Sequence, residues 1–570
     1  MENVKIVLKD EKAKELYERL RKRFSPVKAA ILANRGVENV PDAKTPLPDP
    51  EETLPGVKKA ADTFDGWMRT DPDEVLIHHD FDCDGITGAS ILAKFCEKRY
   101  GISPATLCNS REEGYSFTPE IAERLFQEGY RKIITVDKGI ADKEAVAKFR
   151  ELGGEIIVTD HHMPQGEPPE ADAVVCWTVN GGAKLCGAAT AFWIARAIDE
   201  YEANPFVDMA GVATMVDMVP LSDPVNRVLV MKAYERMKRG IFSNQKWKTF
   251  LEQIGISPRE MTYDDFGYLV GPIINTAGRN DLGNKFLEEM KGSGFFSPFL
   301  SRRLVALNEE RKNVVYDTAV YLDEFLRWEG ERAVFYLIDD PEFIHKNYSG
   351  LVATLKGTDE GKVTFIGFME NGEIKGSARS GRTDFDLQKI FGERFAECEV
   401  KGGGHKAACG FTIPLEKLER FLEILQEEAI EMEDKTEELL FGTPRALTEE
   451  IVNEIKSMEP YGVGFEPPLA AVSDDPGLGM SIRVLKGKHI KMGYSEIPVE
   501  VMAFNVQDAP EVAKELRSAR KKGEKLAFTG NLSFNDFGGT RKISLILDSP
   551  VKVVKTVERE IRKNEFIPEM

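Results

Sequence analysis

The sequence predicts a multidomain α/β protein with a parallel-sheet domain, a long connecting helix, a second α/β domain and a small C-terminal β-barrel. Three patterns lead to this prediction. From about residue 72, short β-branched apolar runs alternate with helical stretches, which is typical of a parallel sheet covered by helices. Residues 297–330 keep a helical period over most of their length. Residues 469–555 alternate apolar and polar side chains between glycine-containing turns.

A chain of 570 residues is too long for one ordinary core, so we expect several domains. Residues 1–24 have the pattern of an amphipathic helix, and six prolines between residues 25 and 56 predict a mostly extended segment. The predicted segments are an N-terminal extension (1–60), a catalytic domain (61–296), a connecting helix (297–330), a nucleotide-gripping domain (331–432), a linker (433–468), the β-barrel (469–555) and a tail (556–570).

In the first large domain we expect strands at residues 75–77, 132–136 and 155–159, with a helix at 86–100 and another ending near 152. Ligands of such sheets bind beyond the carboxyl ends of the strands.

Composition excludes several classes of protein. No run of about 18 apolar residues exists, so no membrane span is expected, and the charged first twelve residues are unlike a signal peptide. Seven cysteines without a CxxC pair predict a reducing, cytoplasmic environment and no zinc ribbon. The net charge of −19 argues against a surface that is basic throughout, but it leaves room for a local basic groove.

Three carboxylates, Asp80, Asp82 and Asp84, follow the predicted strand VLIHH at intervals of two residues. Carboxylates so close together repel one another, and a divalent cation removes that penalty. His78, just before them, offers a nitrogen ligand. A solvated acidic loop is the alternative, whereas an EF-hand is excluded because loop position 12 is Ile91 rather than Glu.

Further polar side chains follow the next two predicted strands. Asp137 comes directly after residues 132–136, and Asp160, His161 and His162 come directly after 155–159. Taken singly, Asp137 is typical of a helix cap and a histidine pair is usually structural. Parallel strands, however, end at one edge of a sheet, so three such clusters predict a metal site there. Asp217 lies in an apolar, helix-like stretch, where a carboxylate is costly unless it is paired or coordinated.

The order DFDCDG, TVDKG, VTDHH and Asp217 resembles the DHH phosphoesterase superfamily. Other segments are similar to its RecJ-type branch: ILANRG (31–36), NSREEGYSF (109–117), GPIINTAGR (271–279), GSARS (376–380), GGGHKAACGF (402–411) and LKGKHIK (485–491). The resemblance covers residues from about 26 to about 552. It implies a DHH domain, a DHH-associated domain and an OB fold.

The resemblance also implies two manganese or magnesium ions at the sheet edge. Asp82 and Asp84 would each bind one ion and Asp137 would bridge them. His161 and Asp217 would complete one site, and Asp80, with His78, would complete the other. Asp160 and His162 would lie behind the ligands or near the substrate.

The remaining site residues are expected to hold phosphate. Arg111 and Arg279 are candidates near the metals, and Ser377 and Arg379 are candidates for a terminal phosphate. Glycines expose backbone N–H groups, so Gly402, Gly403 and Gly404 are expected to grip the nucleotide, with His405 reaching the scissile phosphate. A flexible loop and a surface ion pair are the alternatives. Lys138 departs from the family pattern, and we expect it to tune phosphate affinity.

In the β-barrel, Arg483, Lys486, Lys488 and Lys491 cluster as a basic patch for single-stranded nucleic acid, although solvated lysines give the same pattern. The resemblance thus implies a single-strand-specific exonuclease that releases mononucleotides from 5′ ends of DNA in repair, recombination or replication, with replication or single-strand-binding proteins as partners. Because an extended multidomain chain that encircles a strand could act alone, we expect a monomer. Two alternatives stay open: a phosphodiesterase of short oligonucleotides or RNA ends, and a replisome scaffold.

Overall fold

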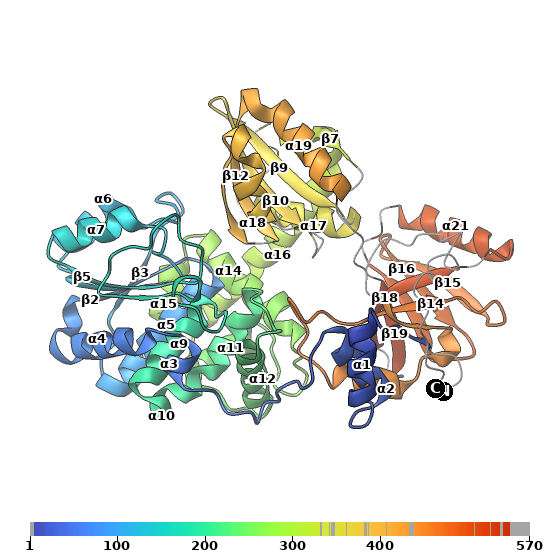
Figure 1. The fold of residues 1–570 in the computed structure, drawn as a ribbon, viewed down its shortest axis with the longest axis horizontal. Helices are drawn as coiled ribbons and strands as arrows, with labels where there is room; N and C mark the ends of the chain where they lie inside the picture. Colours follow the sequence, from blue (N-terminus) through green and yellow to red (C-terminus); the bar gives the residue numbers. More distant parts are fainter. Residues whose placement is uncertain are drawn as a thin grey trace. The chain divides into compact units, whose positions relative to one another are not determined.

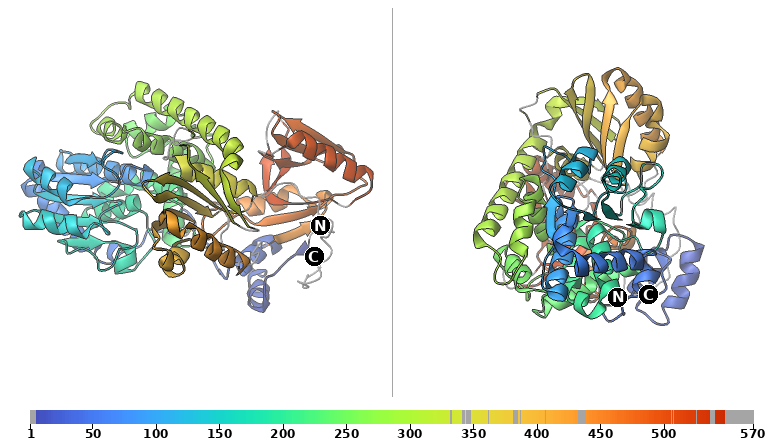
Figure 2. Two further views of the ribbon diagram at one scale, coloured as in Figure 1. Left: turned by 90° about the horizontal axis from the view of Figure 1, so that it is seen from above. Right: turned by 90° about the vertical axis from the view of Figure 1, so that its left-hand side faces the viewer.

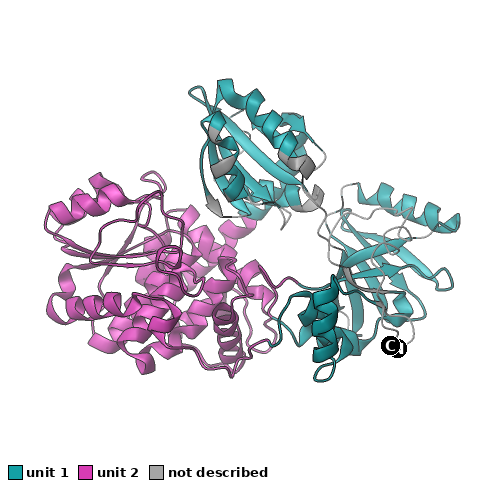
Figure 3. Cartoon of the chain, in the orientation of Figure 1, with its two compact units in different colours: residues 1–39, 311–459, 467–570 teal, residues 40–310, 460–466 magenta. Residues whose placement is uncertain are grey.

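The structure is a computed structural model that describes residues 5–330, 333–340, 343, 348–360, 362–380, 385, 387–405, 407–431, 438–504, 506, 508–524, 526–535 and 540–547. The chain divides into two compact units (Figure 3). Unit 2 comprises residues 40–310 and 460–466, and unit 1 comprises residues 1–39, 311–459 and 467–570. Each unit is described by itself.

Unit 2 is built on a five-stranded parallel sheet with the strand order β3-β2-β4-β5-β6. Its strands are β2 (Val75–His79), β3 (Ala105–Cys108), β4 (Lys132–Val136), β5 (Glu155–Thr159) and β6 (Ala173–Val175). Helices α6 and α7 cover one face, and α4, α5 and α9 cover the other (Figure 1). The parallel α/β class predicted for this part of the chain is therefore confirmed.

Two of the helices around the sheet begin at a residue whose side chain caps them. Asp82 caps α5 by accepting hydrogen bonds from two backbone N–H groups, and Thr118 caps α6 with a hydrogen bond from the N–H group of Ile121. The five helices around the sheet are α4 (Val57–Thr70), α5 (Cys83–Tyr100), α6 (Pro119–Gln127), α7 (Lys143–Glu151) and α9 (Gly187–Ile198). The apolar faces of α6 and α7 pack on the sheet in one cluster that includes Leu125, Phe149 and Ile156.

The rest of unit 2 is helical. Between α3 (Pro50–Thr53) and the connecting helix it contains α8 (Trp177–Asn180), α10 (Glu200–Ala203), α11 (Val207–Val216), α12 (Pro224–Lys238), α13 (Gln245–Gln253), a π-helix (Phe266–Val270), α14 (Gly271–Arg279) and α15 (Gly283–Met290). The predicted helix at 297–330 is α16 (Pro298–Tyr321), which ends earlier than expected because residues 326–329 form strand β7.

In unit 1, residues 326–431 form a mixed six-stranded sheet with the order β11-β12-β10-β9-β8-β7. Its strands are β7 (Leu326–Glu329), β8 (Ala333–Ile338), β9 (Val363–Glu370), β10 (Glu373–Ser380), β11 (Lys401–His405) and β12 (Ala408–Pro414), and its helices are α17 (Ser349–Glu360), α18 (Leu387–Glu393) and α19 (Leu418–Glu431). Phenylalanines 335, 365, 411 and 421 meet in its core.

A second sheet in unit 1 has eight strands in the order β1-β13-β14-β18-β19-β17-β16-β15 (Figure 1; Figure 2). It contains β1 (Lys5–Ile6), β13 (Glu438–Gly442), β14 (Leu469–Ser473), β15 (Met480–Leu485), β16 (His489–Tyr494), β17 (Val499–Ala503), β18 (Ala527–Asn535) and β19 (Lys542–Leu547), with helices α20 (Glu449–Lys456) and α21 (Ala509–Lys521). Among the described residues, β1 and β15 are the outer strands, so the predicted barrel is not closed there. The predicted domain boundaries stay a prediction.

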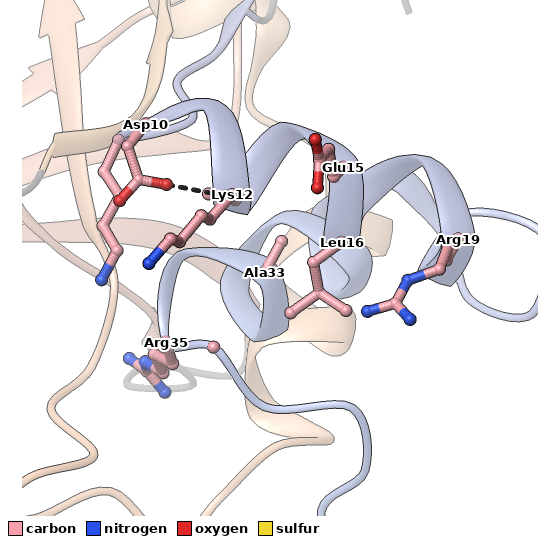
Figure 4. Close-up of a pocket in the computed structure, with 10 residues that line it drawn as sticks. Asp10, Lys12, Glu15, Leu16, Arg19, Ala33 and Arg35 are labelled. Atoms are coloured by element: carbon pink, nitrogen blue, oxygen red, sulfur yellow. Dashed lines mark hydrogen bonds between the residues drawn. The ribbon is translucent and has the colours of Figure 1, made fainter.

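The prediction of an extended segment at 25–56 is wrong in its first part. Helix α2 (Pro26–Asn34) begins with a proline at its first position, where the missing N–H group costs nothing. It packs against α1 (Glu11–Leu20), and the two helices line an open pocket of about 600 Å³ that includes Lys12, Leu16 and Arg35 (Figure 4). Buried Asn34 of ILANRG hydrogen-bonds the backbone of Val7 and Lys9, so this motif holds the chain after β1.

Within the described residues, no helix is long and apolar enough to cross a bilayer.

Candidate metal centre

The carboxyl edge of the parallel sheet in unit 2 gathers the polar clusters that follow its strands. β2 pairs in parallel with β4, with His79 opposite Val136, and β4 pairs in parallel with β5. Asp80, Asp137 and Asp160 are the first residues beyond these three strands. Parallel register therefore brings together side chains that lie 80 positions apart in the sequence.

Seven side chains form three groups whose ligand atoms lie within 4.8 Å of one another. The groups are Asp80, Asp82 and Asp137; Asp84, His161 and Asp217; and Asp137, His161 and His162. Asp137 and His161 each belong to two groups, and the Nε2 atom of His161 lies 3.0 Å from Asp137 Oδ1 and 3.6 Å from Asp217 Oδ2. The geometry therefore resembles two neighbouring cation sites that share ligands.

The backbone around the cluster leaves little freedom to its carboxylates. Asp84 lies in the first turn of α5, and its two oxygens accept hydrogen bonds from the N–H groups of Gly187 and Ala188 at the start of α9. A Cβ atom on Gly187 would lie 2.5 Å from the Cβ of Asp137, so only glycine fits between these two carboxylates. Asn275 of α14 accepts a hydrogen bond from the N–H group of Cys83 and thereby supports the same turn.

The carboxylates of this cluster repel one another more strongly than the neighbouring cations offset. Burial and the neighbouring Asp82 raise the pKa of Asp80 to about 8 and that of Asp84 to about 7. Burial and the charge of Asp84 also raise the pKa values of Asp137 and Asp217 well above their ordinary value. Asp80 Oδ1 and Asp217 Oδ2 are buried without a hydrogen-bond partner among the described residues. Buried, unpaired carboxylate oxygens with imidazole nitrogen are a donor set that fits Mn²⁺ or Mg²⁺.

Asp160 differs from the other carboxylates because its hydrogen bonds are satisfied. It accepts from the N–H groups of Ile140, His161 and His162 and lies 2.7 Å from His162 Nδ1. Burial raises its pKa, but the hydrogen bond and charge of His162 outweigh burial and hold the pKa at about 2. Burial opposes the charge of His162, yet the bond to Asp160 raises the pKa of His162 to about 9. Asp160 thus orients a positively charged His162.

Replacing His162 by glutamine in the metal-free protein should remove a pH-dependent part of its stability. Because the folded-state pKa of His162 is raised from 6.5 to about 9, the contribution is fully present below pH 6.5 and disappears as the pH rises through 9. We expect about 1–2 kcal/mol, since the ring is partly open to solvent. Thermal unfolding in EDTA at about pH 6 and about pH 10 measures it. An equal difference between the variants at both values would contradict the ion pair.

The other residues predicted for this edge occupy different positions. His78 is fully buried, and its Nε2 atom lies 2.9 Å from Asn109 Oδ1, so the structure does not bring it into the three ligand groups. The guanidinium of Arg111 lies 4.4 Å from the ring centre of Phe81, beside the carboxylate turn. Arg279 is the last residue of α14, in which a Cβ atom on Gly278 would overlap the backbone carbonyl of Phe81.

Lys138 does not have the environment expected for a residue that tunes phosphate affinity by direct contact. Its side chain is 1% exposed, and its ammonium donates a hydrogen bond of 2.8 Å to the carbonyl of Tyr115. Sequence reasoning missed this bond, as it missed the roles of Gly187, Asn275 and Asn109. A glycine at the start of a helix of small residues, LCGAAT, was the one available signal.

The phosphate-binding residues predicted in residues 331–432 belong to unit 1. Ser377 and Arg379 lie on β10, beside the start of α17, where Ser377 Oγ is 2.9 Å from Ser349 Oγ. Burial lowers the pKa of the Arg379 guanidinium, which donates to the carbonyls of Ala378 and Cys409. Gly402 and Gly403 lie on β11 opposite Phe411 and Gly410. Gly404 and His405 continue β11, but the position of the His405 side chain lies outside the described residues.

The basic residues predicted for the C-terminal sheet have different surroundings. Arg483 and Lys491 line a pocket of about 520 Å³ on β15 and β16, together with Lys542. Lys486 occupies the turn between these strands with φ +50°, and Lys488 lies 4.1 Å from the ring centre of Tyr316. Lys491 is 2.8 Å from the buried carboxylate of Glu500. Within the described residues, therefore, only part of the basic patch lacks an ion-pair partner.

The chain matches three family models: the DHH family N-terminal domain over residues 74–215, the DHHA1 domain over residues 332–431 and the RecJ OB domain over residues 442–549. Taken together, the three matches cover more than half of the chain and, with the carboxylate and histidine groups at the sheet edge, define the class: the chain belongs to the DHH family. The second and third matches give it the domain set of the RecJ type within that family.

Curated relatives agree over most of the chain. Two proteins named single-stranded-DNA-specific exonuclease RecJ, from Escherichia coli and Bacillus subtilis, are each 26% identical to it, over 92% and 94% of this chain and 95% and 69% of their own. The crystal structure of RecJ in complex with Mn²⁺ from Thermus thermophilus has the same fold, with a TM-score of 0.71 and 22% identity over 95% of this chain and 78% of that one.

Proposed function

We propose that this protein is a metal-dependent exonuclease that degrades single-stranded DNA from its 5′ end and releases mononucleotides. The observation that carries the proposal is the convergence of three ligand groups on one sheet edge in a chain with all three RecJ-type domains. Relatives over more than nine-tenths of the chain bear the name single-stranded-DNA-specific exonuclease, and a structural neighbour with the same fold binds Mn²⁺. We propose a cytoplasmic location and action beside replication or single-strand-binding proteins.

Six side chains are proposed to hold two divalent ions, Mn²⁺ or Mg²⁺: Asp80, Asp82, Asp84, Asp137, His161 and Asp217. Bound divalent ions supply Lewis-acid charge at the scissile phosphate. His162, kept protonated by Asp160, presents a positively charged donor toward the same phosphate. Arg111 and Arg279, near the metal ligands, neutralise phosphate charge of the bound strand. In the second α/β domain, Ser377 and Arg379 bind the terminal phosphate, and Gly402, Gly403, Gly404 and His405 bind the nucleotide backbone.

The test uses long single-stranded DNA labelled at either end, with Mn²⁺, for the native protein and an Asp82→Ala variant. Early release of mononucleotide from the 5′ label, lost in the variant, is the expected result. Release from the 3′ label would keep the metal chemistry and reverse the polarity. Strand binding without release from either end would reject hydrolysis and favour a scaffold.

Replacing Glu500 by glutamine should tighten strand binding to the C-terminal sheet. Glu500 is fully buried, lies 2.8 Å from Lys491 and 3.8 Å from Lys542, and accepts hydrogen bonds from Asn535 and Ser544. Glutamine keeps a polar group of the same shape but frees the charge of the two lysines, so affinity should rise about three- to tenfold at low salt with a steeper salt dependence. Fluorescence anisotropy with a labelled oligonucleotide measures it, and unchanged affinity would show that these lysines do not meet the strand.

A further inference from the structure

Lys138 is a buried cation that has no role in the metal chemistry proposed above. It follows Asp137 directly, and its side chain is 1% exposed, so it does not reach a phosphate in solvent. A buried ammonium is costly unless it is paired and hydrogen-bonded. Its Nζ atom donates to the carbonyl of Tyr115, and the carboxylates of Asp80 and Asp142 compensate its charge.

The carbonyl that Lys138 binds belongs to the loop at residues 109–117, and the loop is held from the protein interior at successive residues. The amide of Asn109 donates to the carbonyls of Gly114 and Ser116, at 2.9 and 2.8 Å. The carbonyl between them, that of Tyr115, is bound by Lys138. The N–H group of Phe117 donates to Asp142. Apart from the bond from Lys138, the structure describes no hydrogen bond to the carbonyl of Tyr115.

This loop carries the aromatic residue that lies against the metal centre. The hydroxyl of Tyr115 is 3.1 Å from the carbonyl of Asp137 and 3.4 Å from His162 Nδ1. Its ring meets those of Phe81 and His162 edge to face, with centres 6.4 and 5.9 Å away. The side chain is still 38% exposed, so one part of it is open to a substrate. A base or a sugar bound at the metal edge would meet this exposed ring.

We propose that Lys138 is a positioning residue that clamps the 109–117 loop, so that Tyr115 is held against Asp137 and His162 to receive the terminal nucleotide. The inference rests on the proposed nuclease function. A lysine suits this task because its ammonium is a strong donor to a carbonyl and its long stem fills the space beneath the loop. A purely electrostatic role, in which the charge acts on the metal ligands, is the competing explanation.

The two explanations predict different effects when Lys138 and Tyr115 are replaced together. Lys138→Met removes the donor and keeps the volume, so KM for a short 5′-phosphorylated oligonucleotide should rise about tenfold, while kcat changes less than about threefold. Tyr115→Ala should raise KM similarly, and the double variant should be no worse than Tyr115→Ala alone. Effects that multiply in the double variant, or a fall in kcat at constant KM, would overturn the clamp.

Two further variants complete the design. Lys132→Met is the matched control, because Lys132 is a buried lysine on β4, the strand that leads to Lys138, at its far end and paired with Asp71. It should leave KM unchanged. Lys138→Arg keeps a charged donor and should restore KM to near the native value. If Lys138→Met does not fold, as judged by circular dichroism, failure of Lys138→Arg to keep a native KM would overturn the proposal.

Hydrogen–deuterium exchange separates this inference from the proposed function. Amides at residues 110–117 should exchange at least about tenfold faster in metal-free Lys138→Met than in the native protein, whereas Lys132→Met should not change them. Native exchange rates in Lys138→Met would overturn the clamp even in an active nuclease. Faster exchange in a protein without nuclease activity would retain the clamp and reject the function that it was proposed to serve.

Discussion

Asp137→Asn is expected to lower nuclease activity by at least about 10³-fold, because Asp137 belongs to two of the three ligand groups. The same change should raise the melting temperature of the metal-free protein. Asp137 is 2% exposed among Asp80, Asp82, Asp84 and Asp217, whose charges with burial raise its pKa, so an amide there removes repulsion. Loss of activity with gain of apo stability is a signature of a cation site, since a structural carboxylate would lose both.

Asparagine is the informative substitution here for a second reason. Asp137 has φ +62°, in the left-handed region that asparagine tolerates and alanine does not, so Asp137→Ala would add backbone strain to the loss of a ligand. Asp208→Asn is the matched control: Asp208 is fully buried and accepts hydrogen bonds from Met209 and Ser243, outside the three groups. It should lower stability and leave activity intact. Mn²⁺ should raise the melting temperature of the control and raise that of Asp137→Asn much less.

The sheet and its metal edge could be predicted from sequence because both follow from local patterns. Two predicted strands, 132–136 and 155–159, agree with β4 and β5 residue for residue, since each is a short β-branched run followed by a polar side chain. Parallel order then forces Asp80, Asp137 and Asp160 to one edge. The helix after the carboxylates begins earlier than predicted, at Cys83, because Asp82 is itself the cap.

The features that could not be predicted from the sequence depend on contacts between distant segments. The N–H groups that hold Asp84 come from Gly187 and Ala188, more than one hundred positions away, and the support of the Cys83 turn comes from Asn275. β1 pairs with β13 over most of the length of the chain, which no local pattern indicates. The position of Lys138 next to Asp137 in the sequence suggests a role at the phosphate, whereas its long side chain carries the ammonium inward to the carbonyl of Tyr115. Such pairings need tertiary structure.

Gly350→Ala is expected to lower kcat/KM on 5′-phosphorylated single strands by about 10²-fold while leaving stability nearly unchanged. Gly350 is in the first turn of α17, and a Cβ atom there would overlap the guanidinium of Arg379. The overlapping atom is the end of a flexible side chain, so the guanidinium moves aside at little cost in free energy. The methyl group therefore displaces the proposed phosphate ligand without deleting it.

Arg379→Lys should have the same effect, because an ammonium lacks the planar fork that binds two phosphate oxygens. Strands with a 5′-hydroxyl, which lack the group that Arg379 would bind, should be cleaved at rates that neither variant changes by more than about threefold. Gly66→Ala is the control, since a Cβ at Gly66 meets nothing within 4 Å. Comparison of initial rates on the two substrates measures the discrimination. If Gly350→Ala and Arg379→Lys both keep the native preference, Arg379 does not bind the terminal phosphate, and 5′ polarity must come from another part of the chain.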